Sequence, residues 1–152
     1  MTSDTPPATD IRLVVGYDGS PPANRALDAA VRLLQGRTGR IEVVYVAHTP
    51  SMASLSAGAV VELEESFDDI EQDLRVMAGE HLEGQVPGWG FERRQGLIGE
   101  ELIAAAKDIS AAQPQATAVI VVGSSSLVTH RLVGSVAVGL ARHSQVPLII
   151  VP

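Results

Sequence analysis

The sequence predicts a three-layer α/β/α sandwich built on a five-stranded parallel sheet in the order 3-2-1-4-5. Short runs rich in Val and Ile alternate with longer stretches of helical periodicity along the 152 residues. Such alternation implies right-handed crossovers between parallel strands. Hydrophobic residues make up 45% of the chain and cysteine is absent, so the core forms without disulfides. We expect one domain over residues 11–152, after a disordered segment over residues 1–10.

The first strand and helix follow from an apolar run and a capping residue. Ile11–Gly16 reads IRLVVG, which is typical of a strand buried on both faces of a parallel sheet. Ser20 suits the N-cap of a helix because a proline follows it at the first helical position. Apolar residues at helical spacing extend this helix to Leu34, and we expect Gly36 and Gly39 to end it.

The next elements are a strand, a loop and a long amphipathic helix. Ile41–Ala47 predicts the second strand, and the small and polar residues 48–59 predict a loop. An apolar stripe at helical spacing then predicts a helix, and its members are Leu63, Phe67, Ile70, Leu74 and Met77. We interpret the acidic residues between Glu62 and Glu71 as a solvated helix face rather than a metal site.

The second half of the chain continues the alternation. Phe91–Gly96 is polar enough for a strand at the edge of the sheet. Residues 99–110 predict a helix, and Ala118–Gly123 predicts the most clearly buried strand. After a polar loop, Ser135–His143 predicts a short helix and Val146–Val151 the last strand.

The predicted strand order indicates where a ligand would bind. The first and fourth strands lie side by side at a topological switch, and ligands bind outside the carboxyl ends of the strands at such a point. Two loops border it, Tyr17–Ser20 and Gly123–Ser135. Glycines let the backbone approach a phosphate, and the helix that begins at Ser135 favours an anion at its N-terminus. The carboxylate of Asp18 suits a ribose hydroxyl or an adenine amino group instead.

Three segments resemble the universal stress protein family of the single-domain bacterial type. They are VVGYDGS at 14–20, AVIVVGSSS at 118–126 and LVGSVAVGLARHSQVPLIIVP at 132–152. The resemblance extends over residues 11–152 and is most specific in the C-terminal third. It implies a stress-response or regulatory protein that binds ATP or a related adenine nucleotide, with Mg²⁺ as a candidate companion ion.

The resemblance also assigns residues to the base and the ribose. Asp18 matches the aspartate that contacts the ribose or the adenine, and Val46 matches the position whose backbone faces the adenine. Val122 would line the pocket beside the start of the phosphate loop.

The phosphate motif of the family reads Gly, two residues, Gly, nine residues, Gly, and then Ser or Thr. Gly123, Gly134 and Ser135 match this motif, whereas Ser126 stands at the second glycine. Only residues 127–133 separate Ser126 from Gly134, so the loop is two residues short. The resemblance implies phosphates near Gly123, Ser124 and Ser126 and near Gly134–Ser135.

Charge and missing motifs narrow the function classes. The net charge of −7 argues against nucleic acid and anionic membranes as partners. The chain has no Walker lysine motif, so we expect no dedicated enzyme and at most slow ATP hydrolysis. Two alternatives remain: a weak ATPase, and a dimeric stress protein that binds no nucleotide and acts through protein partners.

The final strand and the N-terminal composition predict assembly and location. The resemblance implies a homodimer, and the apolar run Val146–Val151 lies at a sheet edge that antiparallel pairing with a second copy would cover. The first ten residues carry acid and proline rather than the features of a signal peptide, and cysteine is absent. We therefore expect a cytoplasmic protein.

Overall fold

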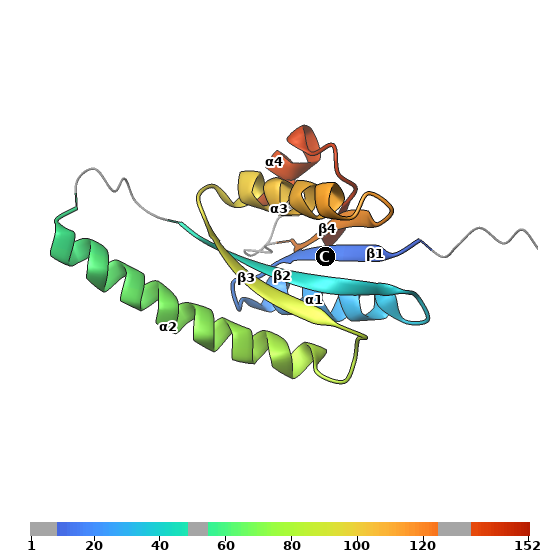
Figure 1. The fold of residues 1–152 in the computed structure, drawn as a ribbon, viewed down its shortest axis with the longest axis horizontal. Coiled ribbons are helices and arrows are strands. Elements are labelled where there is room, and N and C mark those ends of the chain that lie inside the picture. The colour runs from blue at the N-terminus through green and yellow to red at the C-terminus, as the bar shows by residue number, and fades with distance from the viewer. Residues whose placement is uncertain (1–8, 49–54, 125–134) are drawn as a thin grey trace, which may run out of the picture.

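A computed structural model describes residues 9–48, 55–124 and 135–152 of the chain. Its sheet has five parallel strands in the order β3-β2-β1-β4-β5, as predicted (Figure 1). The elements are β1 (Ile11–Gly16), α1 (Pro21–Leu34), β2 (Gly39–Ala47), α2 (Ala57–Leu82), β3 (Trp89–Gln95), α3 (Ile98–Ala112), β4 (Thr117–Gly123), α4 (Ser135–His143) and β5 (Leu148–Val151). The predicted fold class is therefore confirmed.

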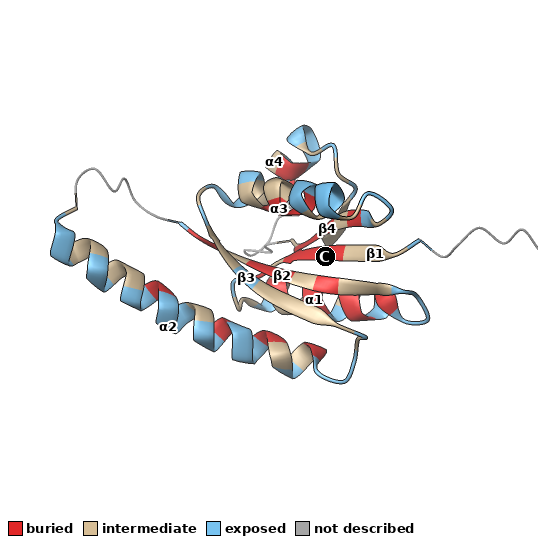
Figure 2. Cartoon of the chain, viewed as in Figure 1, coloured by how far each residue is buried: buried red, intermediate tan, exposed pale blue. Residues whose placement is uncertain are grey.

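Two apolar clusters fill the spaces on the two sides of the sheet. Leu13 and Val15 of β1 pack with residues of α1 and α2, whereas Val14 packs with residues of α3 and α4. This alternation follows from the two-residue period of a strand. Figure 2 shows buried residues concentrated in the central strands and on the inner side of α1. The chain thus forms the three layers that the sequence predicts.

The helix α1 begins as predicted, but its end differs from the prediction. The Ser20 Oγ accepts a hydrogen bond from the Ala23 N–H at 3.3 Å, which caps the helix. Gly36 adopts a φ of 71° just after the helix ends. Gly39 does not end the helix: it is the first residue of β2, where it pairs with Ile11. A Cβ at Gly39 would overlap the Ile11 carbonyl oxygen, so the close approach of the two strands requires glycine there.

The helix α2 is longer than the sequence indicates. It begins at Ala57, inside the segment predicted as a loop, because the Ser56 Oγ accepts a hydrogen bond from the Ala59 N–H at 3.2 Å. Figure 1 shows its first turns extending past the end of β3. The predicted stripe is only partly buried: Phe67 and Leu74 are buried, whereas Ile70 and Met77 are 39% and 37% exposed.

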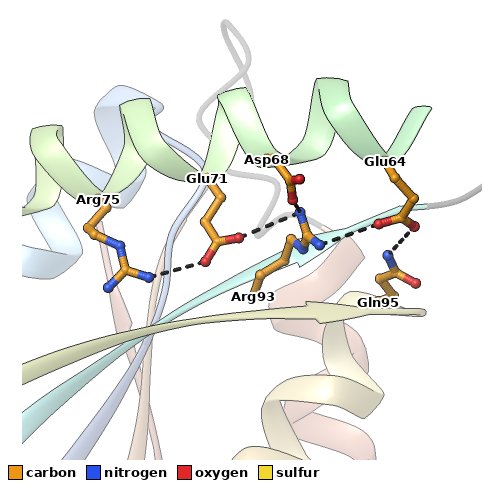
Figure 3. Close-up of polar contacts among 6 residues, drawn as sticks. All are labelled: Glu64, Asp68, Glu71, Arg75, Arg93 and Gln95. Atoms are coloured by element: carbon orange, nitrogen blue, oxygen red, sulfur yellow. Dashed lines mark hydrogen bonds and ion pairs between the residues drawn. The ribbon is translucent and has the colours of Figure 1, made fainter. Parts of the chain in front are cut away.

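The acidic side of α2 faces the edge strand β3 (Figure 3). The Arg93 guanidinium lies 2.8 Å from Asp68, 3.4 Å from Glu64 and 3.5 Å from Glu71. Its hydrogen bond to Asp68 raises the pKa of Arg93, so the guanidinium stays charged. These three carboxylates pair with the sheet, while the Asp68 side chain is still 68% exposed, so the predicted solvated face also carries ion pairs to β3. In the described ranges, no three His, Asp or Glu side chains could together hold a metal ion.

The neighbouring Arg94 pairs with the helix on the other side of the sheet. Its guanidinium lies 2.7 Å from Asp108 and 3.7 Å from Glu101, both in α3. Consecutive side chains of a strand point to opposite faces, so these two arginines fix one helix on each face of β3. This edge strand is thus covered by ion pairs in addition to the apolar packing of Trp89 and Phe91.

The last strand starts later than predicted. The Val146 N–H donates a hydrogen bond to the Ser144 Oγ at 3.1 Å, which forms a turn after α4. The ladder with β4 begins when the Ile120 N–H donates to the Pro147 carbonyl at 2.9 Å, and β5 starts at Leu148. Among the described residues, no helix has the length and apolar character needed to cross a membrane.

Candidate functional site

A cavity of about 180 Å³ lies at the carboxyl edge of the sheet, where β1 and β4 are neighbours. Residues from β1, β2 and β4 and from the beginnings of α1, α3 and α4 line it. Five of the predicted site residues are in this lining: Asp18, Val46, Val122, Gly123 and Ser135. Segments far apart in the sequence therefore meet at the predicted topological switch.

Asp18 makes the turn that connects β1 to α1. Its Oδ1 accepts a hydrogen bond from the Ser20 N–H at 3.0 Å. The next residue, Gly19, has a φ of 78°, and a Cβ there would lie 2.8 Å from Leu74. Among the described residues, no hydrogen bond involves the Oδ2 of the exposed Asp18, so this oxygen can accept one from a ligand.

Both tyrosines of the chain, Tyr17 and Tyr45, border the cavity. Tyr17 is buried, and its hydroxyl donates a hydrogen bond to the Asn24 Oδ1 at 2.8 Å. Burial raises the pKa of Tyr17, and the nearby carboxylates, Asp18 first among them, raise it further. Burial also raises the pKa of Tyr45, while Arg93 counteracts part of this effect. Tyr17 therefore serves as a neutral, structural wall of the site.

Gly123 ends β4 against the first turn of α1. A Cβ at this position would overlap the carbonyl carbon and oxygen of Pro22. The backbone of Pro22 cannot move away without disturbing the start of α1, so packing alone requires glycine here. Gly123 is thus in the cavity wall, and its presence has a structural explanation that does not depend on a ligand.

The remaining predicted residues are not part of the described cavity lining. The Ser124 N–H donates a hydrogen bond to the Val151 carbonyl at 2.7 Å, which extends the contact between β4 and β5. Ser126 and Gly134 lie outside the described residues. Of the predicted phosphate site, the structure therefore describes Gly123 and Ser135 in the cavity lining and Ser124 beside it.

A comparison with protein-family models identifies the family of the chain over nearly its whole length. The model of the universal stress protein family matches residues 12–152. The chain belongs to the universal stress protein family. No protein of curated function matches the sequence.

Solved structures of universal stress proteins share the fold. A family member from Burkholderia pseudomallei has 26% identity and a TM-score of 0.60, over 93% of this chain and 95% of that chain. A universal stress protein in complex with cAMP has 23% identity and a TM-score of 0.64, over 93% and 96%. A family protein from Arabidopsis thaliana with AMP bound has 14% identity and a TM-score of 0.57, over 93% and 90%.

The cavity of this universal stress protein also contains residues that the sequence analysis did not assign to a site. Val44 and Leu102 form part of its apolar wall, and Ile98 stands at the start of α3. Leu102 is recognisable from the sequence as a buried helical residue, but only the packing of α3 against the sheet brings it to the cavity. The helices α3 and α4 both begin at this cavity, so backbone N–H groups at two helix N-termini face the same region.

Proposed function

We propose that this universal stress protein binds an adenine nucleotide at the carboxyl edge of its sheet. The observation that carries the proposal is the single cavity around which Asp18, Val46, Val122, Gly123 and Ser135 meet. Two structural relatives that bind cAMP and AMP support the adenine class. The bound nucleotide would serve a stress-response or regulatory role in the cytoplasm rather than a dedicated reaction.

The adenine base occupies the cavity in this proposal. The volume of about 180 Å³ is below the roughly 300–1,000 Å³ of pockets that enclose a whole drug-sized ligand, so it takes part of a nucleotide. The apolar side chains of Val46, Val122 and Leu102 suit a flat aromatic base. The backbone at Val46 offers hydrogen bonds to its edge, and the Oδ2 of Asp18 accepts one from the ribose or the adenine amino group.

The phosphates point toward α4 in this proposal. The N-terminus of this helix favours an anion, and the exposed hydroxyl of Ser135 adds a donor. The loop from Ser124 through Ser126 to Gly134 would complete the phosphate site. ATP, ADP and AMP are the ligands to compare, with Mg²⁺ as the companion of the longer phosphate chains.

Calorimetric titration with ATP, ADP and AMP, each with and without Mg²⁺, tests the proposal directly. We expect saturable heat from at least one adenine nucleotide and none from the matched guanine nucleotide. A protein that gives neither heat nor a thermal shift with any adenine nucleotide at millimolar concentration would refute it.

The substitution Asp18→Asn isolates the role of the carboxylate. Asparagine keeps an oxygen for the Ser20 N–H, so the turn is preserved, but its amide nitrogen replaces the oxygen offered to the ligand. We expect nucleotide binding to weaken by roughly 10- to 100-fold, since a hydrogen bond to a charged group contributes about 1.5–3 kcal/mol. Asp73→Asn, on the exposed side of α2, is the control and should bind like the wild type.

We further propose a homodimer formed through β5. Among the described strands β5 is at the edge of the sheet, and its apolar residues, Leu148–Val151, offer the backbone groups of that edge to a second copy. Light scattering should give twice the chain mass of 15.9 kDa at micromolar concentration. A monomer mass under those conditions would count against this assembly and leave the nucleotide proposal intact.

A further inference from the structure

A second cavity lies between α3 and α4, beside the one proposed for the nucleotide. Its volume is about 350 Å³, within the roughly 300–1,000 Å³ of small-molecule pockets. Leu97, Ile103, Val136 and Leu140 give it mainly apolar walls. Leu97 lies at its rim and is 56% exposed. The described residues therefore leave a cavity that is large enough for a small molecule.

A glycine in α4 opens this cavity. Gly139 lies in the middle of the helix, where glycine is less favourable than any residue except proline. A Cβ there would meet no heavy atom within 4 Å, so packing within the described protein does not require the glycine. This contrasts with Gly123, where the backbone of Pro22 leaves no room for a side chain. The absence of a side chain at Gly139 therefore leaves room in the cavity, and no contact among the described residues explains the glycine.

The polar groups of the lining define the kind of ligand. Glu100 is the only carboxylate in the described lining, and none of the ion pairs within the described ranges involves it. The remaining polar side chains belong to Ser135 and His143, and neither Lys nor Arg is in the described lining. A net charge of −7 for the chain adds a long-range attraction for cations. The cavity thus combines apolar walls with an acidic rim.

We propose that the α3–α4 cavity binds a small molecule with an apolar body and a single ammonium group. The apolar body lies over Gly139 between the two helices, and the ammonium group donates hydrogen bonds to the carboxylate of Glu100. This site is separate from the proposed adenine position but adjoins it, because Ser135 and Val136 line both cavities. It needs no bound nucleotide.

Phenethylammonium is a suitable probe, because it joins an aromatic body to one ammonium group. We would titrate it into the full-length protein, without nucleotide, and follow methyl NMR signals of Leu97, Ile103 and Val136. Hydrocinnamate, with a similar body and a carboxylate, is the matched probe of opposite charge. We expect saturable shifts with phenethylammonium and at least about tenfold weaker binding of hydrocinnamate.

Two variants connect the signal to the cavity. Gly139→Leu fills the space and should weaken phenethylammonium binding about tenfold, while Glu100→Gln should remove the preference for the cation. Gly58→Leu is the matched control, because Gly58 is also a helical glycine with no atom within 4 Å of its Cβ position. This control should bind the probe like the wild type, and circular dichroism verifies that each variant is folded.

Three results would overturn the proposal. The first is the absence of saturable shifts with phenethylammonium, and the second is equal affinity in the wild type and in folded Gly139→Leu. The third is a set of methyl signals that move with protein concentration alone, which would mean that a second copy covers the groove. None of these results bears on nucleotide binding, which the calorimetric titration measures separately.

Discussion

The glycines of this protein differ in whether the structure leaves room for a side chain. At Gly123 a side chain would overlap the backbone of Pro22, whereas at Gly139 it would enter open space. The sequence predicts a ligand role for Gly123 from its motif, but the position is also fixed by packing that no motif records. The two positions are therefore a natural pair for comparing alanine substitutions.

We expect Gly123→Ala and Gly139→Ala to change stability in opposite directions. Overpacking against Pro22 should lower the free energy of unfolding by about 1–3 kcal/mol. Alanine at position 139 should raise it by about 0.5–1 kcal/mol, since alanine is the better helix former. Urea unfolding measures both changes as shifts of the midpoint, provided that the dependence of the free energy on urea concentration is unchanged. Equal stability of Gly123→Ala and the wild type would show that Pro22 yields more easily than its contact suggests.

Tyr17 should lose its proton at a higher pH than a free tyrosine and make the free energy of unfolding depend on pH. Burial, followed by the charges of Asp18, Glu80 and Asp28, raises its pKa above the ordinary 10.0. The folded state therefore holds the phenolic proton more tightly than the unfolded state. This contribution to stability is complete below pH 10.0 and is lost as the pH rises through the folded-state pKa.

Absorbance of the tyrosinate checks this expectation. Tyr45→Phe leaves Tyr17 as the only tyrosine, so one titration curve reports on it. The midpoint should lie above that of the same variant in denaturant. Coincident midpoints would mean that Tyr17 is accessible to water in the folded protein.

At the scale of elements, ion pairs reinforce the apolar packing that holds the edge of the sheet. The long helix α2 contributes Phe67 and Leu74 to the core, and Glu64, Asp68 and Glu71 pair with Arg93 (Figure 3). A periodicity analysis cannot foresee this pairing, because an acidic helix face looks the same whether it meets water or an arginine from a distant strand.

Arg93→Ala should loosen α2 from the sheet. Its loss removes three ion pairs between β3 and α2, so we expect a stability loss of about 1–2 kcal/mol, more than an isolated surface pair provides. The difference from the wild type should shrink in concentrated salt, since ions screen partly exposed charges. Lys107→Ala, at an exposed helical position, is the control and should show neither effect. A loss independent of salt would indicate packing by the arginine stem instead.

At the scale of the whole molecule, the strand order follows from the sequence better than the element boundaries do. The five predicted strands and their order are confirmed: four of them form the apolar runs that buried parallel strands produce, and the polar β3 is at the edge. The start of α2 was missed because Ala57 and its small neighbours show no apolar period. The start of β5 was misplaced because Val146 is apolar but hydrogen-bonds into the turn after α4.

The candidate site was predictable in its location and less so in its composition. The strand order alone places the ends of β1 and β4 together, and motifs identify Asp18, Gly123 and Ser135. The apolar wall from Ile98 and Leu102 depends on how α3 packs on the sheet, which is a tertiary property. The cavity between α3 and α4 depends on the distance between two helices, which no sequence pattern predicts.

The contact between Pro22 and Gly123 also has a consequence for protein engineering. Because two main chains touch there, a designer gains little at position 123: most replacements would damage the scaffold before they altered selectivity. Ser135, exposed at the first turn of α4, and Ile98, 40% exposed at the start of α3, leave more freedom. Libraries intended to retarget this cavity should therefore vary those two positions and keep residue 123 constant.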